Sequence, residues 1–531
     1  VDRRQRQMCI RDRNKKIRNI LAYGCLACSM MAMPSCVGDL DMKPNDPNSK
    51  TELNSAAEYE GFFYQLYNGL VVSGPQGCSD ITVEDGGAGT YMRQLWNLEE
   101  LPTDETLIGK NWNDAGIDEL DFSTWSPDNH WLYEAMSRFT FQINMCNEFI
   151  RTIDKAAGMI SDDEIAAMKR EAIVLRALSY YHLMDNFGKG PFTDENSTVG
   201  ATPPTLTRAE MFEKIVPQLA ETVKDLTPAS AQKYGRLSRE AGYMLLAKFY
   251  LNAEVYTGTA RWQDCANACN EILKTINTLA PDYKYLFCAD NDRFVGNGEI
   301  LWGLPQDENN QQTYGGTTYL SIGAYNSNVS ATTQGLQGTG WSGPRIRPEL
   351  ADMFESGDNR YLISNNGGKL KNNLEDLGDW GADGCGLMCI KYVYTKSDDY
   401  YNTTGATLVN TFNGTDYPLF RLADTFLMLA ECELNGATGC NGQDMFDKVR
   451  ARAGLAPILL TKDKLFEERA RELYWEGHRR SDMIRFGKFT GGAYKWSWKG
   501  GALRGRSIPD YRKVYAIPTK FVPTLGQNEG Y

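Results

Sequence analysis

The sequence predicts a mainly α-helical fold, a scaffold of tetratricopeptide-like helix pairs with long irregular loops and a few short strands. Three helix starts support this prediction. A Ser or Thr followed three residues later by Glu forms a capping box, which satisfies the first unpaired amides of a helix. Such boxes stand at Ser55–Glu58, Ser161–Glu164 and Thr207–Glu210. Paired helical segments and two long aperiodic segments are the other observations behind the prediction.

Apolar periodicity extends these helices and pairs them. Behind Ser161, apolar residues recur at steps of three or four from Ile173 to Phe187, and Gly188 is placed to end the helix. Two later stretches each indicate a helix, a short turn and a second helix, the arrangement of a tetratricopeptide unit. They are REAGYMLLAKFYLNAEVY with RWQDCANACNEILKTI, residues 239–276, and RLADTFLMLAECEL with QDMFDKVRARAGL, residues 421–455.

Two long segments have another character. Residues 73–131 and 302–415 are rich in Gly, Asn, Asp, Thr and Tyr and show little periodicity. Loops of this length usually have a function or carry short strands and helices of their own. At the start of the second segment, EILWGLP, residues 299–305, predicts a buried strand around Trp302.

The first 36 residues have the composition of an export signal. Basic residues precede an apolar run, residues 20–36, which is too short to span a membrane. The run ends at Cys36 as a lipoprotein signal does, so we expect Cys36 to carry lipid; an ordinary secretory leader with an incidental cysteine is the alternative. Residues 37–50 are polar and indicate a tether, which leaves residues 51–531 as a single domain.

Charge and metal-ligand content limit the function classes. The formal charge of −12 argues against a nucleic-acid partner, whose phosphates need a basic surface. The three histidines are far apart and form no HExxH pair, so no zinc site is expected. We expect no cofactor, although the acid-rich segment CADNDR, residues 288–293, could hold a structural calcium ion. Nine cysteines follow Cys36, so at least one has no partner within the chain.

Arginines and acids alternate in ERARELYWEGHRRSDMIRFGKF, residues 468–489, which predicts one helix. Pairs four residues apart, Glu467–Arg471 and Glu476–Arg480, each stabilise a helix by roughly 0.2–0.5 kcal/mol. The signs cancel, and buried Arg–carboxylate pairs fix packing more often than they perform chemistry. We therefore expect a structural ion network. Its members are Arg469, Glu472, Glu476, Arg479, Arg480, Asp482 and Arg485.

Three stretches resemble motifs of the SusD/RagB family. REAIVLRALSYYHLMDNFGKGPF, residues 170–192, resembles the family's R-A-x-x-Y-x-L-x-x-x-[FY]-G-x-[VG]-P helix. Residues 468–489 resemble its E-R-x-x-E-L-x-x-E-G-x-R-[RW]-x-D-x-x-R-[WF]-G helix. The tail AIPTKFVPTLGQNEGY, residues 516–531, resembles its P-I-P…QNPGY ending, with Glu529 in place of the proline. Together with YPLFRLADTFLMLAECEL and the lipoprotein start, the resemblance covers essentially residues 36–531.

The resemblance implies a lipid-anchored protein of the outer membrane, exposed on the cell surface. Such a protein binds an oligosaccharide, polysaccharide or peptide and delivers it to a TonB-dependent transporter of the SusC type, with no chemistry of its own. Residues 93–125 resemble the starch-type branch, which favours a glycan. Two alternatives stay open. A secreted glycoside hydrolase needs two catalytic carboxylates, and no GxSxG, P-loop or HExxH signature appears. A scaffold that binds only protein is disfavoured by the export signal and the aromatic loops.

A glycan site needs two kinds of side chain. Aromatic rings take the C–H faces of sugars, and planar polar groups take their hydroxyls. Residues 91–131 and 302–341 supply both in polar, aperiodic chain, although core packing is the alternative for any single tryptophan. The predicted stacking residues are Trp96, Trp112, Tyr325 and Trp341. The predicted polar partners are Arg93, Asn97 and Asp114.

Overall fold

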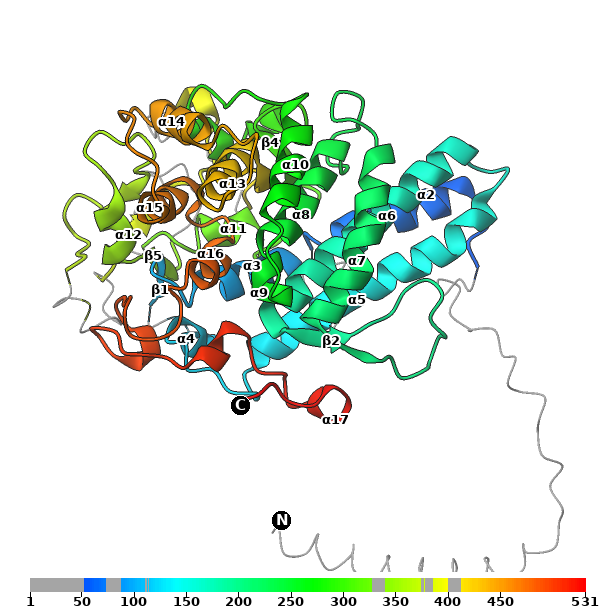
Figure 1. Ribbon diagram of the computed structural model, residues 1–531, viewed down its shortest axis with the longest axis horizontal. Coiled ribbons are helices and arrows are strands. Elements are labelled where there is room, and N and C mark those ends of the chain that lie inside the picture. The colour runs from blue at the N-terminus through cyan, green and yellow to red at the C-terminus, as the bar shows by residue number, and fades with distance from the viewer. Residues whose placement is uncertain are drawn as a thin grey trace, which may run out of the picture. The chain divides into compact units, whose positions relative to one another are not determined.

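The computed structural model describes residues 52–72, 87–109, 112, 114–326, 340–373, 377, 385–399 and 412–531. Residues Ser55–Tyr531 form one compact unit, and Val1–Asn54 are a second unit. The described part of Ser55–Tyr531 is mainly helical, which confirms the predicted fold class (Figure 1). Cys36 and the predicted tether lie outside the described residues.

The helices follow one another along the chain with short strands between them. The first nine labelled helices are α2 (Ala56–Asn68), α3 (Tyr91–Glu100), α4 (Ile117–Asp121), α5 (His130–Thr152), α6 (Asp162–Phe187), α7 (Arg208–Thr222), α8 (Arg239–Leu251), α9 (Ala253–Thr257) and α10 (Trp262–Leu273). The later ones are α11 (Thr317–Leu320), α12 (Pro348–Met353), α13 (Leu422–Leu434), α14 (Gly442–Arg452), α15 (Lys462–Leu473), α16 (Arg479–Arg485) and α17 (Val522–Leu525).

The predicted capping residues begin their helices. Ser55 and Ser161 accept the amide hydrogens three residues later, at N–O distances of 3.4 and 3.3 Å. Thr207 and Glu210 form a complete capping box at the start of α7. Gly188 ends α6 with a φ of 70°, a conformation that glycine adopts without the strain other residues incur. Local sequence therefore fixes these helix ends.

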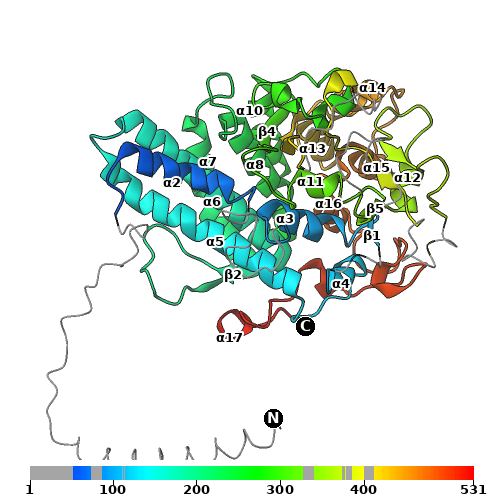
Figure 2. The same ribbon diagram turned by 180° about the vertical axis from the view of Figure 1, so that it is seen from behind.

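Helices that are near one another in the sequence pack in pairs. Helix α5 packs along α6, α8 along α10, and α13 along α14, and α10 also contacts α13. Figures 1 and 2 show α2, α5, α6 and α7 gathered at one end and α12 to α15 at the other. Ala266 and Cys269 on α10 are fully buried, as expected for small residues where two helices cross. Both predicted helix pairs are present.

Within the described residues, short strands pair into four two-stranded antiparallel sheets. The strands are β1 (Thr106–Ile108), β2 (Lys189–Pro191), β3 (Thr205–Thr207), β4 (Ile300–Leu304), β5 (Pro344–Ile346), β6 (Ile363–Ser364), β7 (Met388–Cys389) and β8 (Tyr417–Arg421). Strand β4 pairs with β8, and its Trp302 is 1% exposed, which confirms the predicted buried strand. Strands β1 and β5 come from the two long loops and pair with each other.

The prediction of one helix over residues 468–489 is wrong. The chain turns between α15 and α16, where Trp475 and Gly477 have φ values of 62° and 74°. A carboxylate oxygen of Glu100 accepts the amide hydrogens of Gly477 and His478, at 2.6 and 3.2 Å. Because of this turn, Glu476 does not pair with Arg480 but binds Arg421 instead. A long-range carboxylate thus outweighs local helix preference.

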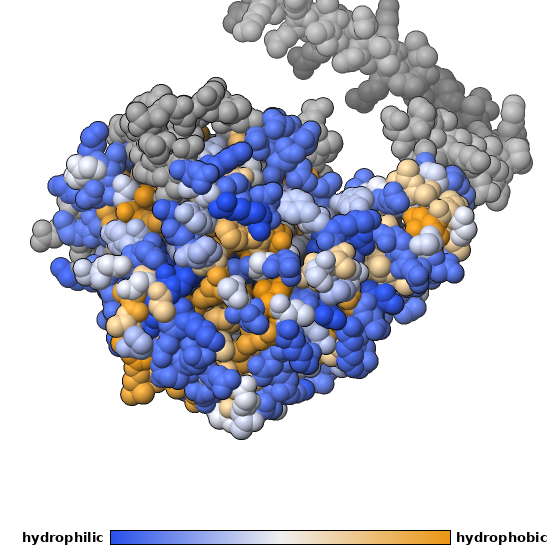
Figure 3. Space-filling model, turned by 90° about the horizontal axis from the view of Figure 1, so that it is seen from above, coloured by the Kyte–Doolittle hydropathy of each residue, from blue (hydrophilic) through white to orange (hydrophobic). Residues whose placement is uncertain are grey.

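The face of the described chain that is seen in Figure 3 is mostly hydrophilic. On this face, hydrophobic residues form separate patches among hydrophilic ones. None of the helices in the described chain combines the length and the apolar character that a membrane span needs.

Candidate functional site

The pairing of β1 with β5 brings two half-buried tryptophans together. Ile108 at the end of β1 lies opposite Pro344 at the start of β5. The residues that follow β1 therefore lie beside those that precede β5. Trp112 and Trp341 stand in these positions, with ring centroids 6.1 Å apart and ring planes inclined by 37°. Both rings keep part of their surface open to solvent.

Two more partly exposed rings continue this surface. Tyr314 is 42% exposed, and its ring centroid lies 5.8 Å from that of Trp341 with the planes inclined by 60°. The ring of Phe412 lies 4.9 Å from that of Tyr314. We call Trp112, Trp341, Tyr314 and Phe412 the aromatic platform. Successive ring planes are inclined by 37°, 60° and 45°, so the platform is a row of tilted rings rather than a flat surface.

Glycines allow the backbone to approach these rings. A Cβ atom at Gly343 would lie 2.7 Å from Cζ3 of Trp112, a distance that Cβ atoms essentially never show. A Cβ atom at Gly323 would lie 3.2 Å from Cε3 of Trp341, and one at Gly87 would lie 2.6 Å from Cβ of Tyr314. Gly343 and Gly87 therefore leave room for ring positions that any other residue would change.

A single carboxylate oxygen orients the Trp112 ring. The Nε1–H group of Trp112 donates to Oδ2 of Asp114 at 2.6 Å. The same oxygen binds the guanidinium of Arg93 at 2.5 Å. The side chain of Asp114 is 22% exposed, whereas that of Arg93 is 1% exposed. Asp114 thus lies at the edge of the platform and links its ring to a buried cation.

Arg93 lies beneath the platform and not on it. Its guanidinium carbon is 4.2 Å from the ring centroid of Tyr319 and 5.4 Å from that of Trp131, so the cation is enclosed by aromatic faces. The prediction that Arg93 meets sugar hydroxyls is wrong for this conformation because no surface is left for a ligand. Arg93 instead supports Asp114, which the structure leaves accessible.

Three further residues that the sequence predicts to contact a ligand are also buried. Every residue of α3 is buried, and Trp96 on it is 0% exposed and donates from Nε1 to the carbonyl oxygen of Trp475 at 3.2 Å. Asn97 accepts the Tyr319 hydroxyl at 3.2 Å. The Tyr325 hydroxyl donates to the Tyr392 carbonyl, also at 3.2 Å. The expectation that Trp96, Asn97 and Tyr325 face a ligand is wrong because each is used in core packing.

Two members of the platform, Tyr314 and Phe412, are not among the contact residues predicted from the sequence. Tyr314 stands in QQTYGG and Phe412 in NTFNGTD, where polar and glycine neighbours indicate exposure, so a signal for both was present. Their contact across almost a hundred residues could not be predicted from that signal. Of the seven predicted contact residues, the structure brings Trp112, Trp341 and Asp114 to the accessible surface.

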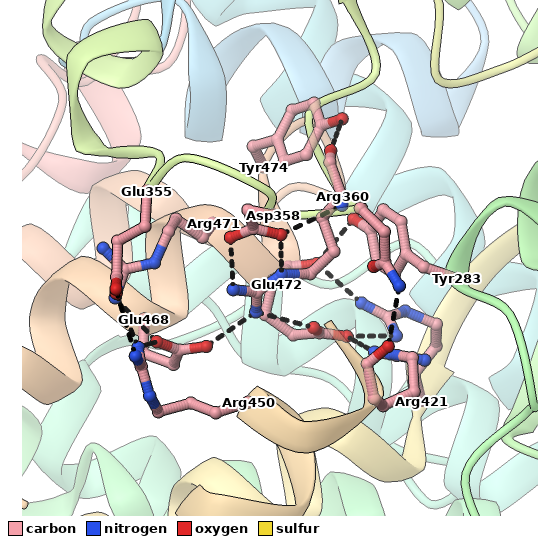
Figure 4. Close-up of polar contacts among 12 residues, drawn as sticks. Tyr283, Glu355, Asp358, Arg360, Arg421, Arg450, Glu468, Arg471, Glu472 and Tyr474 are labelled. Atoms are coloured by element: carbon pink, nitrogen blue, oxygen red, sulfur yellow. Dashed lines mark hydrogen bonds and ion pairs between the residues drawn. The ribbon is translucent and has the colours of Figure 1, made fainter. Parts of the chain in front are cut away.

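A second cluster, the buried ion network, surrounds α15 (Figure 4). The Glu472 carboxylate binds the guanidinium groups of Arg452, Arg421 and Arg360, the last two at 2.9 and 3.1 Å. Burial raises the pKa of Glu472, but these three cations outweigh burial and lower the pKa to about 2. Glu472 is therefore ionised at neutral pH although it is fully buried.

Other members of the ion network are also multiply paired. Glu476 binds Arg421 at 2.6 Å and Lys391 at 2.7 Å. Asp482 binds Arg469 and Arg485, both at 2.7 Å. Burial raises the pKa of Asp482, and the two arginines outweigh it and lower the pKa to about 2. These contacts join β8, α15 and α16 through buried charges.

The ion network reaches the helix that lies beneath the platform. Asp104 lies just after α3, and Arg479 binds both of its carboxylate oxygens at 2.7 Å. Arg480 lies 3.6 Å from Glu99 on α3. Helix α3 also carries Arg93. The contacts between α16 and α3 therefore fix the foundation on which Trp112 and Asp114 rest.

The described residues contain no cluster of three or more His, Cys, Asp or Glu side chains that could hold a metal ion. In the acid-rich segment predicted as a possible calcium site, Asp290 accepts the backbone N–H and the hydroxyl of Ser397, both at 2.8 Å. These contacts occupy both Asp290 carboxylate oxygens within the protein.

Two family models match the chain. The model described as "SusD family" matches residues 365–523, and the model described as "Starch-binding associating with outer membrane" matches residues 85–251. The first contains α15 and α16, and the second contains α3, Trp112 and Asp114. The two matches therefore cover both halves of the contact between α16 and α3.

Two similar proteins match nearly the full length of the chain. The chain is 29% identical to the starch-binding protein SusD of Bacteroides thetaiotaomicron, over 98% of this chain and 100% of that one. It is 25% identical to SusD-like protein P25 of Formosa agariphila, over 89% of this chain and 90% of that one. The fold is similar to a solved structure, that of surface glycan-binding protein A from Bacteroides thetaiotaomicron in complex with laminarihexaose. The TM-score is 0.69 and the identity 20%, over 90% of this chain and 100% of that one.

Proposed function

Because the chain belongs to the SusD/RagB family, we propose that it captures a glycan on the aromatic platform. The observation that carries this proposal is the row of tilted, partly exposed rings with Asp114 at its edge. Aromatic faces bind the C–H faces of sugar rings, and a carboxylate accepts hydroxyl hydrogens. The platform offers both in one surface.

The platform geometry favours a glycan chain that curves. Neighbouring ring planes are inclined by 37° and 60°, so a flat, extended polysaccharide ribbon would touch one ring and leave the next. A chain that turns from one sugar to the next keeps contact along the row. A starch-binding relative and a fold neighbour solved with laminarihexaose are consistent with a glucan as ligand.

Binding without hydrolysis suits this surface. A glycoside hydrolase needs two carboxyl groups roughly 5–9.5 Å apart, one of them with a raised pKa. Asp114 already accepts hydrogen bonds from Arg93 and Trp112. This arrangement supports a role in positioning and recognition for Asp114, rather than one in acid catalysis.

The proposed cellular role is supported by the family and by the export-signal composition of the first 36 residues. The protein is placed at the cell surface by lipid on Cys36, and it delivers bound oligosaccharide or polysaccharide to a TonB-dependent transporter of the SusC type. The acidic net charge gives little attraction to anionic lipid, so acyl chains would supply the attachment.

Affinity electrophoresis tests the binding proposal. Tyr314→Ala and Trp341→Ala should each reduce retention in gels that contain soluble starch or laminarin by about tenfold, roughly 1.4 kcal/mol of binding free energy. Tyr361→Ala is a matched control, because Tyr361 is 43% exposed and packs on Phe354 away from the platform rings. Equal retention of all three variants and the wild type would reject the platform as the site.

The same preparation separates the alternatives. Steady release of new reducing ends from either polysaccharide would favour a glycoside hydrolase. Absence of retention on a broad panel of polysaccharides, together with co-purification of a transporter, would favour a scaffold that binds only protein.

A further inference from the structure

A second pocket, far along the chain from the platform residues, has a volume of about 590 Å³. This volume lies within the range of roughly 300–1,000 Å³ typical of small-ligand sites. The ends of α9, α10, α13, α15 and α16 surround it. Figure 1 shows α9 and α16 on the side toward the viewer, whereas α3 and α11 come to the front in Figure 2.

The floor of this pocket is apolar. It includes Trp262 at the start of α10, together with Val255, Leu434 and Phe486. All four side chains are half-buried, so each presents some surface to the pocket. Trp262 is half-buried and lines the pocket, so part of its indole is accessible to a ligand.

The rim of the pocket is positively charged although the whole chain is acidic. Five cations and three acids line it, a net of +2, in a chain with a formal charge of −12. Two of the three acids are neutralised within the protein, because Glu431 binds Arg485 at 2.6 Å and Asp463 binds Lys488 at 3.0 Å. The remaining acid is the exposed Glu254.

Two cations remain to bind a ligand. Among the described residues Arg208 forms no ion pair. Burial lowers its pKa, and the nearby Tyr256 and Asp185 side chains partly offset this effect. The Lys462 ammonium is exposed and donates to Oδ1 of Asn435 at 3.0 Å. A partly desolvated guanidinium outside any ion pair is stabilised by an incoming anion, and its planar fork suits a carboxylate.

We propose that this pocket is a second binding site, and that it takes a negatively charged saccharide unit, a hexuronate residue. The sugar ring lies on Trp262, its carboxylate meets Arg208 and Lys462, and Glu254 accepts a hydroxyl hydrogen. The proposal goes beyond glycan capture on the platform, because it assigns a different ligand class to a different surface.

Titration calorimetry of the full chain with trigalacturonate at low ionic strength tests the proposal. Wild type should bind, and binding should weaken at least fivefold when salt is raised, because ion pairs at a partly exposed site are screened. Trp262→Ala and Lys462→Gln should each weaken trigalacturonate binding at least fivefold and leave retention on neutral glucan unchanged. Trp341→Ala is the matched control and should show the reverse pattern.

Two results would overturn the second site. One is absence of trigalacturonate binding to the wild type at low salt. The other is equal binding of a triglutamate peptide, which has the same charge without a sugar ring. Thermal unfolding confirms that each variant is folded; should Trp262→Ala fail to fold, the exposed Lys462→Gln and the triglutamate comparison still decide the outcome.

Discussion

The aromatic platform and the ion network use the same residue types for opposite purposes. On the platform, Trp112 and Trp341 are half-buried and rest against glycines, and a single carboxylate orients one of them. In the ion network, Arg360 and Glu472 are fully buried and each has several charged partners. The platform rings stay accessible to a ligand and are therefore less buried, so they contribute less to stability. The ion network is buried, so it stabilises the fold but has no surface that a ligand could reach. Binding and stability should therefore respond to different substitutions.

Removing Glu472 should have the largest effect on stability. Glu472→Ala leaves three buried arginines without one of their acceptors, and breaking a buried ion pair costs about 3–5 kcal/mol. Urea denaturation of the purified variant measures the loss. Glu221→Ala is the control, because its pair with Lys224 is exposed and should change stability by less than about 1 kcal/mol. Similar midpoints for both variants would contradict a stabilising network.

The pH dependence of stability tests the same network without mutation. The folded-state pKa values of Glu472 and Asp482, about 2, lie below their ordinary values of 4.5 and 3.8. Their contribution to stability is therefore complete above about pH 4.5 and is lost as the pH falls toward 2. Burial raises the pKa of Asp416 from its ordinary value of 3.8 to about 7, so its contribution is present below about pH 4 and is lost as the pH rises from there to 7.

These opposing groups predict a maximum in the free energy of unfolding between about pH 4 and pH 5. Urea unfolding at a series of pH values measures the profile. A stability that stays level from pH 5 down to pH 2 would show that the carboxylates of the network are not linked to folding.

A glycine substitution separates binding from stability on the platform. Gly343→Ala places a Cβ atom 2.7 Å from Cζ3 of Trp112, so the ring must shift and glycan retention should fall by about tenfold. Gly61→Ala on α2 is the control, because a Cβ atom there would meet no atom beyond its own helix backbone within 4 Å, and helical propensity should raise stability by roughly 0.5–1 kcal/mol. Affinity gels and thermal unfolding read the two effects. Unchanged retention in Gly343→Ala would mean that the position of Trp112 is unimportant.

Asp114→Asn should have the smallest effect. The amide oxygen can still accept the Trp112 Nε1–H group, but the charge that binds Arg93 is lost. We expect a two- to fivefold loss of glycan retention, read in the same gels, with Arg93→Lys giving a similar loss. A loss as large as that of Trp341→Ala would show that Asp114 itself supplies most of the binding free energy.

Most of the fold could be predicted from the sequence because helix starts are local. Ser55, Ser161 and Thr207 each cap a helix through atoms three residues away, and Gly188 ends one through its own backbone freedom. The break after α15 could not be predicted in this way. It depends on Glu100, which lies more than 370 residues earlier in the chain and accepts the amide hydrogens of the turn.

The candidate site was harder to predict because exposure is a property of the folded chain. Trp96 and Trp112 stand in the same loop-rich region, yet one is buried against Trp475 and the other faces solvent beside Trp341. Arg93 looks like a ligand-binding residue in the sequence, and only its enclosure by Tyr319 and Trp131 shows that it acts from below. Residue type predicted the chemistry of the site, and long-range packing decided which residues carry it.

A crystal structure of the protein with a linear maltooligosaccharide of seven glucose units tests the central claim most directly. The account predicts sugar rings against Trp112 and Trp341, with a hydroxyl within hydrogen-bonding distance of Asp114. A bound oligosaccharide located elsewhere, with the platform rings bare, would contradict it.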